Sequence, residues 1–273
     1  MTQQQSDVPG IPDYARLLDG KVAVVTGGGA GIGEGITRLF RQHGATVEVA
    51  EIDPERAEAV GGSVVDVTDV EQVNAFAAGV LERHGRCDVL VSNVGDYRPL
   101  VRFEKSTPES WDDMLRINFT QHLAVIRAFL PSMRERKHGV IVNVHSVEGM
   151  RGYPGEPIYG ALKAATAKLT TDLAVRYGRD GIRVNGIGPD LTQSPQVDYL
   201  TGWEDHDDLW TSWAPVGRLG WPEDQARVAL FLASDMSAFV TGHNIPVDGG
   251  TKAGGGWFYS PTEHRFANRP KGL

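Results

Sequence analysis

The sequence has a single cysteine, Cys87, among its 273 residues. One cysteine cannot form an internal disulfide, and it excludes zinc sites built from several cysteines. Because Cys87 directly precedes an apolar segment, we expect it to pack as a small buried side chain. The eight histidines show no metal-binding spacing, and we interpret His206, within the acidic run 204–208, as part of a solvated loop. The sequence therefore predicts no metal site.

Long apolar runs and a positive net charge are also lacking. No apolar stretch approaches the roughly 20 residues that a membrane-spanning helix needs. The formal net charge of -8 argues against nucleic acid or an anionic membrane as the main partner. The first ten residues, MTQQQSDVPG, lack the charged-then-apolar layout of a signal peptide. We therefore expect a cytoplasmic protein whose partners are small molecules, with no nucleic acid and no membrane.

Short apolar segments alternate with helical patterns along most of the chain. The segments are continuously apolar, which is typical of parallel strands covered on both faces. The alternation predicts an α/β fold, a single doubly wound (Rossmann-like) domain whose mostly parallel seven-stranded sheet has helices on both faces. The expected strands are 21–26, 45–52, 62–65, 88–92, 139–146, 182–187 and 244–247, and the expected helices are 34–43, 54–60, 71–84, 107–136, 159–177 and 224–232.

The ends of the chain differ from its middle. Residues 1–19 are polar and are expected to form a leader, followed by an NAD-binding catalytic domain over 20–250. Within that domain, residues 190–222 hold Trp203, Trp210 and Trp213, and we expect a lid over the substrate; simple packing of this segment onto the body is the alternative. The aromatic tail, 251–273, follows three glycines and could cover its own pocket or that of a neighbouring subunit.

The glycine-rich segment 26–33, TGGGAGIG, follows an expected strand and opens an expected helix. Glycines allow positive φ angles and let the backbone approach a diphosphate, and the helix start offers free N–H groups. The spacing is T-G-x-x-x-G-x-G rather than G-x-G-x-x-G, so a purely structural turn is the alternative. We expect Gly27, Gly31, Ile32 and Gly33 to contact a dinucleotide.

The second expected strand ends in acidic residues. Glu51 lies 18 residues after Gly33, where a carboxylate can accept hydrogen bonds from the adenosine ribose. Its charge would repel a 2′-phosphate, and neither Ala30 nor Ile52 is basic, so NAD is favoured over NADP. A surface glutamate at a strand end is the alternative. Asp53 precedes a proline and is expected to be a helix N-cap instead.

A serine, a tyrosine and a lysine form the candidate catalytic group. Ser146 ends an expected strand, Tyr159 follows 13 residues later, and Lys163 lies one helical turn further along the same face. A nearby ammonium and a cationic nicotinamide would lower the pKa of the phenol from its ordinary value near ~10. Tyr159 could then exchange a proton with an alcohol oxygen that Ser146 holds.

With these features the sequence resembles the short-chain dehydrogenase/reductase family along about residues 18–250. The resemblance implies that Tyr159 is the acid/base, that Lys163 binds the nicotinamide ribose, and that Ser146 orients the substrate. It also implies an assembly, usually a homotetramer and otherwise a dimer, through the long helices around Asn118 and Tyr159. The matching segments are TGGGAGIG at 26–33, DVTD at 66–69, SNVG at 92–95, Asn118, Ser146, YGALK at 159–163, IGPD at 187–190 and VDGG at 247–250.

The resemblance implies further roles at matching positions. Asn118 would anchor a water that links Lys163 to solvent. Six residues would contact the cofactor: Asp66 and Val67 at the adenine, Asn93 and Gly95 after the fourth strand, and Pro189 and Ser194 at the nicotinamide, where Ser194 stands in place of the usual threonine.

Several positions depart from the family pattern. Ser92 and Val94 replace the first asparagine and the alanine of N-N-A-G, and Asp190 replaces a glycine after Pro189. Two residues flank Ser146: we expect His145 to face away from it and to pack, and Glu148 to be a candidate for the substrate pocket.

The sequence therefore predicts an NAD-dependent oxidoreductase that moves a hydride between NAD(H) and a secondary alcohol or ketone, apolar or cyclic, with Tyr159 as acid/base. The alternative is a non-catalytic NAD-binding sensor or scaffold on the same fold, which would not need the intact serine, tyrosine and lysine. A sugar-nucleotide epimerase is a further possibility, but such chains are usually longer.

Overall fold

The structure, a computed structural model, describes residues 14–99, 101–195, 197, 212–256, 258–260 and 264–267. Its centre is a seven-stranded sheet in the order β3-β2-β1-β4-β5-β6-β7, and every pair of neighbouring strands is parallel. The predicted doubly wound sheet is confirmed. The strands are β1 (Val22–Thr26), β2 (Thr46–Glu51), β3 (Ser63–Val64), β4 (Val89–Ser92), β5 (Gly139–Val144), β6 (Ile182–Pro189) and β7 (Asn244–Val247).

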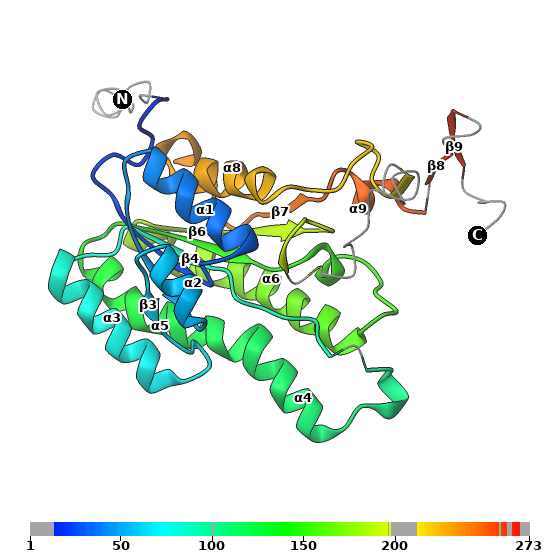
Figure 1. Cartoon of the computed structure of the whole chain (residues 1–273). Coiled ribbons are helices and arrows are strands. Elements are labelled where there is room, and N and C mark those ends of the chain that lie inside the picture. Colours follow the sequence, from blue (N-terminus) through cyan, green and yellow to red (C-terminus); the bar gives the residue numbers. More distant parts are fainter. Residues whose placement is uncertain are drawn as a thin grey trace.

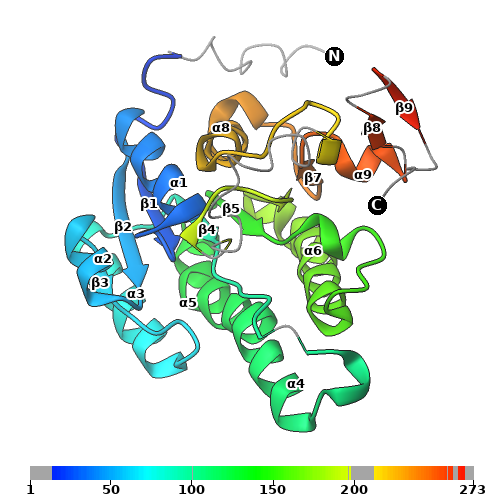
Figure 2. The ribbon, with the colours of Figure 1, turned by 45° about the vertical axis from the view of Figure 1, so that its right-hand side comes forward.

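Helices cover both faces of this sheet (Figures 1 and 2). Side chains along a strand alternate between the faces, so Ala23 and Val25 pack toward α1 and α8 while Val22 and Val24 pack toward α3, α5 and α6. The helices are α1 (Gly31–Gln42), α2 (Pro54–Ala59), α3 (Val70–His84), α4 (Pro108–Leu115), α5 (Gln121–Glu135), α6 (Pro157–Tyr177), α8 (Pro222–Ala233) and α9 (Thr251–Gly254).

Helix starts follow the capping signals of the sequence. Asp53 accepts hydrogen bonds from the backbone of Glu55 and Arg56, which confirms it as the N-cap of α2. Thr107 and Ser110 form a reciprocal capping box at the start of α4. α1 begins at Gly31, three residues before the expected start.

The long helix expected over 107–136 is not continuous. A π-helical turn, η2 (Arg116–Thr120), separates α4 from α5, and Asn118 lies within it. β5 also ends at Val144, so Ser146 lies beyond the strand and caps a short 3-10 turn, η3 (Val147–Gly149). Both corrections concern residues at the candidate site, where regular structure gives way to special backbone geometry.

The two ends of the described chain differ in how they pack. Leu18 is fully buried and belongs to the core. After α9, the strands β8 (Phe258–Ser260) and β9 (Arg265–Ala267) form an antiparallel hairpin that extends away from the central sheet (Figures 1 and 2). Cys87 is buried, and burial raises its pKa far above the ordinary thiol range, as expected of a packed side chain.

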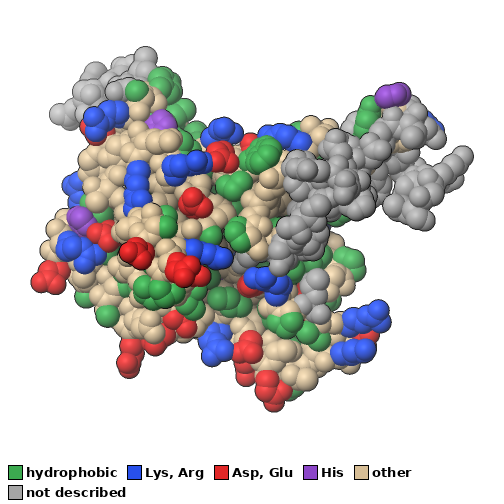
Figure 3. Space-filling view, in the orientation of Figure 1, with side chains coloured by type: hydrophobic (Ala, Val, Ile, Leu, Met, Phe, Trp, Pro, Cys, Tyr) green, Lys and Arg blue, Asp and Glu red, His purple; other side chains and the backbone are tan. Residues whose placement is uncertain are grey.

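Among the described residues, none of the helices has both the length and the apolar character needed to cross a membrane. The same part of the chain has no group of histidine, cysteine, aspartate and glutamate side chains that could hold a metal ion. On the face shown in Figure 3, lysines and arginines are interspersed with aspartates and glutamates.

Candidate active site

A cavity of about 500 Å³ lies at the carboxyl ends of the parallel strands, where ligands bind in doubly wound sheets. Nearly all the predicted site residues line it. Asn118 is not one of the lining residues and lies behind them. The predicted residues that line the cavity are Gly27, Gly31, Ile32, Gly33, Glu51, Asp66, Val67, Asn93, Gly95, Ser146, Tyr159, Lys163, Pro189 and Ser194.

The glycine loop forms one end of the cavity. Gly27 and Gly31 have φ angles of +62° and +53°, a region that side chains disfavour. A Cβ at Gly33 would overlap the carbonyl oxygen of Gly27. No side chain caps the start of α1, so its first N–H groups are available to a ligand. This bare, positively polarised backbone fits the diphosphate of a dinucleotide.

Glu51 is buried, with 6% of its surface exposed, at the end of β2. Its carboxylate accepts hydrogen bonds from the backbone of Gly29 at 3.0 Å and of Ile52 at 3.0 Å. A Cβ at Gly29 would lie 2.9 Å from a Glu51 oxygen, so the loop and the carboxylate are closely packed. The carboxylate is therefore fixed at the cavity wall, in the position expected for binding a ribose hydroxyl.

Arg56 also lines the cavity near Glu51, and the sequence reasoning missed it. It lies in the first turn of α2, and its Cβ is 2.9 Å from where a Cβ of Gly29 would be. Its guanidinium faces Asp53 at 3.7 Å and remains half exposed. Arg56 follows Glu51 by five residues, a spacing that belongs to no cofactor-binding motif. The turn from β2 into α2 brings Arg56 to the cavity, and this turn could not be inferred from the spacing. A cation is therefore present where a 2′-phosphate could reach it.

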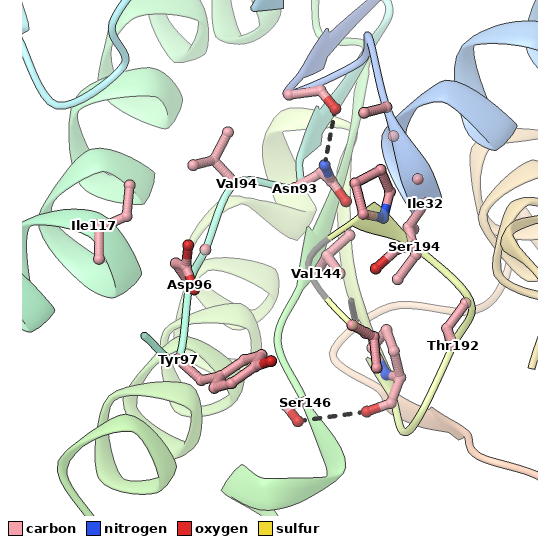
Figure 4. A pocket seen from close by; sticks show the side chains of 18 of the residues that line it. Ile32, Asn93, Val94, Asp96, Tyr97, Ile117, Val144, Ser146, Thr192 and Ser194 are labelled. Atoms are coloured by element: carbon pink, nitrogen blue, oxygen red, sulfur yellow. Dashed lines mark hydrogen bonds between the residues drawn. The ribbon is translucent and has the colours of Figure 1, made fainter. Parts of the chain in front are cut away.

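Local hydrogen bonds hold the part of the cavity that Asp66, Val67 and Asn93 line. Asp66 accepts from the backbone and hydroxyl of Thr68, at 2.9 and 2.7 Å, and adjacent Val67 is buried. Asn93 donates to the Thr26 carbonyl at 3.0 Å. It also donates to the Gly27 carbonyl at 3.4 Å (Figure 4), and the two bonds tie the end of β4 to the start of the glycine loop. These bonds fix the floor of the cavity.

Ser146, Tyr159 and Lys163 come together at the other end of the cavity. The Ser146 hydroxyl accepts from the backbone of Glu148 at 3.2 Å and donates to the Pro189 carbonyl at 3.4 Å (Figure 4). Tyr159 lines the cavity beside this hydroxyl, and the Lys163 nitrogen is 5.4 Å from the centre of the tyrosine ring. The predicted catalytic group is thus assembled from η3 and α6.

The electrostatics of this group are set mainly by burial. Burial raises the pKa of Tyr159, the Ser146 hydroxyl lowers it, and nearby carboxylates raise it further. Burial lowers the pKa of Lys163 to about 8, while Asp96 raises it. Burial is the largest cause of the raised tyrosine pKa in the protein alone. The lowering that we expect from Lys163 together with a cationic nicotinamide stays a prediction.

Asn118 holds the segment that follows β4. Its side-chain oxygen accepts from the backbone of Asp96 at 3.1 Å, and its amide donates to the Asp96 carbonyl at 2.7 Å. A Cβ at Gly95 would overlap the Lys163 nitrogen and lie 3.0 Å from the Asn118 oxygen, so a side chain there would displace the Lys163 amine. The oxygen and the nitrogen of the Asn118 side-chain amide therefore both bind the backbone of Asp96.

Aromatic side chains surround the catalytic tyrosine. The rings of Tyr97 and Tyr153 meet Tyr159 edge to face, with ring centres 6.3 and 6.2 Å away. Tyr97 and Asp96 follow Val94 along the chain, and Thr192 and Ser194 lie opposite them (Figure 4). Tyr97 and Tyr153 line the cavity but lack a motif, so sequence spacing did not single them out.

The family-divergent Ser92 has a specific partner. Its hydroxyl lies 2.6 Å from Nδ1 of His122, and both side chains are fully buried. Burial lowers the pKa of His122 well below its ordinary value, so the imidazole is neutral.

The nearby His145 is also buried. Its ring occupies the space where side chains at Gly186 and Gly188 would otherwise lie, and burial lowers its pKa to about 4. The packing expected of His145 is thus observed.

Glu148 and Asp190, the other two unusual residues, are joined by Arg151, which the sequence reasoning missed. Arg151 donates to both oxygens of Glu148, at 3.2 and 2.7 Å, and to Asp190 at 3.0 Å. Both carboxylates line the cavity. Arg151 and Asp190 are 39 residues apart and meet only through the fold.

Much of the expected lid lies outside the described residues, including Trp203 and Trp210. Ser194 lies beside the glycine loop, because a Cβ at Gly31 would be 2.9 Å from its Cβ. Trp213 is 37% exposed and is not among the described residues that line the cavity. In the tail, Trp257 is outside the description.

The chain is similar to known proteins over most of its length. A family model described as enoyl-(acyl carrier protein) reductase matches residues 27–252. The 3-oxoacyl-(acyl-carrier-protein) reductase of Thermotoga maritima is 39% identical over 246 residues, covering 85% of this chain and 98% of the relative. The crystal structure of levodione reductase is 30% identical, with a TM-score of 0.81, and covers 86% of this chain and 99% of that chain. A 3-ketoacyl-(acyl-carrier-protein) reductase from Brucella melitensis, complexed with NADH, is 30% identical with a TM-score of 0.79, at the same coverage of 86% and 99%.

A fold and a site of this kind define an oxidoreductase that binds a nicotinamide dinucleotide at the end of a doubly wound sheet. The chain belongs to the short-chain dehydrogenase/reductase family, as its sequence motifs implied. It therefore transfers a hydride between a nicotinamide and an alcohol or carbonyl carbon.

Proposed function

We propose that this protein is an NAD-dependent dehydrogenase or reductase of secondary alcohols and ketones, with Tyr159 as the acid/base. The observation that carries the proposal is one continuous cavity with a bare glycine loop at one end and Ser146, Tyr159 and Lys163 at the other. A dinucleotide joins two such ends, so its reactive ring would face the tyrosine. A cyclic substrate is supported by the structural likeness to levodione reductase.

NAD is supported by the fixed carboxylate of Glu51, which accepts hydrogen bonds at the cavity wall and would repel a 2′-phosphate. The similar Brucella melitensis structure holds NADH. When bound, NAD would supply the hydride acceptor and a positive charge on its nicotinamide ring. The diphosphate would be held by Gly27, Gly31, Ile32 and Gly33. The adenosine and nicotinamide parts of NAD would be held by Asp66, Val67, Asn93, Gly95, Pro189 and Ser194.

The chain's own residues would move the proton. Ser146 would hold the alcohol oxygen, and Tyr159 would take its proton during oxidation or return one during reduction. Burial raises the pKa of Tyr159, so the neutral phenol can give a proton to the carbonyl oxygen during reduction. To take the alcohol proton during oxidation, Tyr159 must first lose its own proton and become the phenolate. Lys163 would hold the ribose and favour the phenolate by its charge, and Asn118 would support the segment beside it.

We extend the proposal to the organisation of the chain. Residues 1–19 would be a leader, 20–250 the catalytic domain with a lid at 190–222, and 251–273 a tail. The enzyme would be cytoplasmic, in keeping with its one buried cysteine. It would assemble as a homotetramer, or a dimer, through α5 and α6, where an exposed apolar groove lies.

The test is a panel of secondary alcohols, including cyclic ones, with NAD and the appearance of NADH as the readout. Tyr159→Phe should lower kcat/KM by about 100- to 10,000-fold, because general acid–base catalysis contributes that much, and should leave NADH binding intact. Tyr14→Phe, at an exposed position, is the matched control. Full activity of Tyr159→Phe would overturn the mechanism. NADH binding with no turnover of any alcohol would favour the non-catalytic sensor.

A further inference from the structure

Three loops that follow neighbouring strands of the sheet are joined by one charged cluster. Glu148 follows β5, Asp190 follows β6, and Thr251 follows β7 at the start of α9. Arg151 bridges the first two, binding Glu148 through two nitrogens and Asp190 at 3.0 Å. The Thr251 hydroxyl donates to the same Asp190 oxygen. The cluster fixes the geometry of the substrate end of the cavity.

The carboxylates and the guanidinium of this cluster occupy different places. Glu148 and Asp190 line the cavity, with side-chain exposures of 14% and 7%. Arg151 is not among the described residues that line the cavity, so it binds the carboxylates from outside the lining. A ligand in the cavity would therefore meet the acidic groups before the cation.

The cluster itself carries a net negative charge beside Ser146, in addition to the Lys163 ammonium that lines the same cavity. Two carboxylates share one guanidinium, which leaves one net negative charge. The neighbouring Asp96 is compensated by Arg98, which binds it at 3.0 Å. Glu148 is two residues from Ser146, and its backbone donates to the serine hydroxyl. Asp190 directly follows Pro189, whose carbonyl accepts from that same hydroxyl. The two carboxylates thus lie next to the two backbone groups that position the Ser146 hydroxyl, which would hold the reacting oxygen.

Glu148 also keeps capacity for another donor. An ionised carboxylate has about four lone-pair sites, and Arg151 supplies the two hydrogen bonds that the structure shows for the Glu148 oxygens. Asp190 is more fully engaged, because its oxygens accept from Arg151, Thr251 and the backbone of Leu191. Glu148 is therefore the acceptor in this cluster that a substrate hydroxyl could use.

We propose that Glu148 and Asp190 determine substrate specificity: they exclude alcohols with an anionic group next to the carbinol carbon and favour neutral alcohols with a second, adjacent hydroxyl, which Glu148 binds. The inference rests on the proposed function and names the substrate class of the same site. A carboxylate placed there would be repelled by the net negative charge in a region of low dielectric constant. A vicinal diol would instead donate a hydrogen bond to it.

The test compares three ring-matched substrates with NAD: cyclohexanol, vicinal cyclohexanediol and the corresponding vicinal hydroxycarboxylate. For the wild type, kcat/KM should rank the diol first and the hydroxycarboxylate last, with at least about a tenfold gap between these two. In Glu148→Gln and in Asp190→Asn, the ratio of hydroxycarboxylate to cyclohexanol activity should rise by about tenfold. In Glu148→Gln the preference for the diol should also fall.

Each ratio is measured within one variant, so partial unfolding of that variant does not change it. Glu104→Gln, at an exposed position outside the cavity lining, is the control and should keep the wild-type ratios. Oxidation of cyclohexanol with equal or better use of the hydroxycarboxylate would overturn the inference and leave the proposed function standing. Unchanged ratios in both variants would do the same. No oxidation of any of the three would contradict both.

Discussion

Glu51 shows how a single residue at the cavity wall can choose between two cofactors. Its carboxylate is held by backbone N–H groups of the glycine loop and of β2's end, so it cannot easily turn away from a phosphate. Arg56 lies in the same part of the cavity and would attract a phosphate. Under the proposed function, we expect the cofactor preference to depend on the balance of these two opposite charges, and the fixed, buried carboxylate should dominate because burial reduces solvent screening.

We predict that Glu51→Gln raises the ratio of NADP to NAD activity by about tenfold or more, because the repulsive charge is removed while an acceptor for Gly29 remains. The measurement is kcat/KM for each cofactor with one alcohol. Glu55→Gln, at an exposed position of α2, is the control. Adding Arg56→Ala to Glu51→Gln should reverse the gain. An unchanged cofactor ratio in Glu51→Gln would show that this carboxylate does not select the cofactor.

Lys163 is a residue whose proposed role conflicts with stability. Burial lowers its pKa from 10.5 to about 8 in the folded protein. The unfolded chain therefore binds the proton more tightly, and the charged form opposes folding. This cost is fully present below pH 8 and disappears as the pH rises toward 10.5.

We predict that Lys163→Met is more stable than the wild type at neutral pH, by about 3 kcal/mol, since each pKa unit corresponds to about 1.36 kcal/mol. The difference in unfolding free energy should shrink as the pH is raised through this range. Denaturant unfolding at several pH values measures it. Lys168→Met, at an exposed position of the same helix, should show no such dependence. A gap that stays constant with pH would refute the argument.

At the scale of elements, the π-helical turn η2 is the feature that positions Asn118. The extra residue of this turn interrupts the regular helical pattern between α4 and α5. Asn118 in this turn binds both backbone groups of Asp96, and its own carbonyl accepts from Thr166 of α6 at 3.3 Å. The turn therefore joins the segment after β4 to the helix that carries Tyr159 and Lys163.

We predict that Asn118→Ala costs about 1–3 kcal/mol of stability, because it leaves the partly buried backbone groups of Asp96 without partners. It should also raise KM for the alcohol several-fold, since Tyr97 follows Asp96 and contacts Tyr159. Thr107→Ala removes an N-cap of α4 and should cost about 1 kcal/mol with unchanged KM. Thermal unfolding and steady-state kinetics test both. If the two variants have the same KM, Asn118 acts on stability alone.

Elements with a local sequence signal were predictable. The strands are continuously apolar, and Asp53 and Thr107 precede prolines, so strand positions and these helix starts follow from neighbouring residues. The glycine loop and the pair Tyr159 and Lys163 also depend on short spacing, and the structure brings them to one cavity.

Contacts between distant residues were not predictable. Ser92 and His122 are 30 residues apart, and Arg151 and Asp190 are 39 apart. Arg151 and Asp190 meet because the neighbouring strands β5 and β6 end at the same edge of the sheet, and Ser92 and His122 meet because α5 packs against β4. The π-turn was hidden for a different reason: its residues, RINFT, lack the proline or glycine that usually marks an interruption.

At the scale of the whole molecule, an apolar groove of about 360 Å³ lies on the outer side of α5 and α6. Leu123, in the first turn of α5, lines this groove and is 41% exposed. A two-fold contact would place the groove of a second copy against this one. Each contact would then occur twice, and the apolar residues of both copies would be covered. The groove residues are Leu123, Ile126, Arg127, Leu130, Pro131, Arg134, Leu169, Leu173 and Tyr177.

We predict that Leu123→Lys reduces the proposed tetramer to smaller species, because the symmetric contact would bring two lysines into an apolar interface near Arg127 of each copy. Sedimentation velocity over a range of concentrations measures the assembly. Ala78→Lys, at an exposed position of α3, adds the same charge away from the groove and should leave assembly unchanged. Because Leu123 is already partly exposed, its replacement should cost the single subunit little stability, so a loss of assembly can be separated from unfolding by circular dichroism. A wild type that is monomeric, or a Leu123→Lys variant that assembles normally, would exclude this groove as the contact.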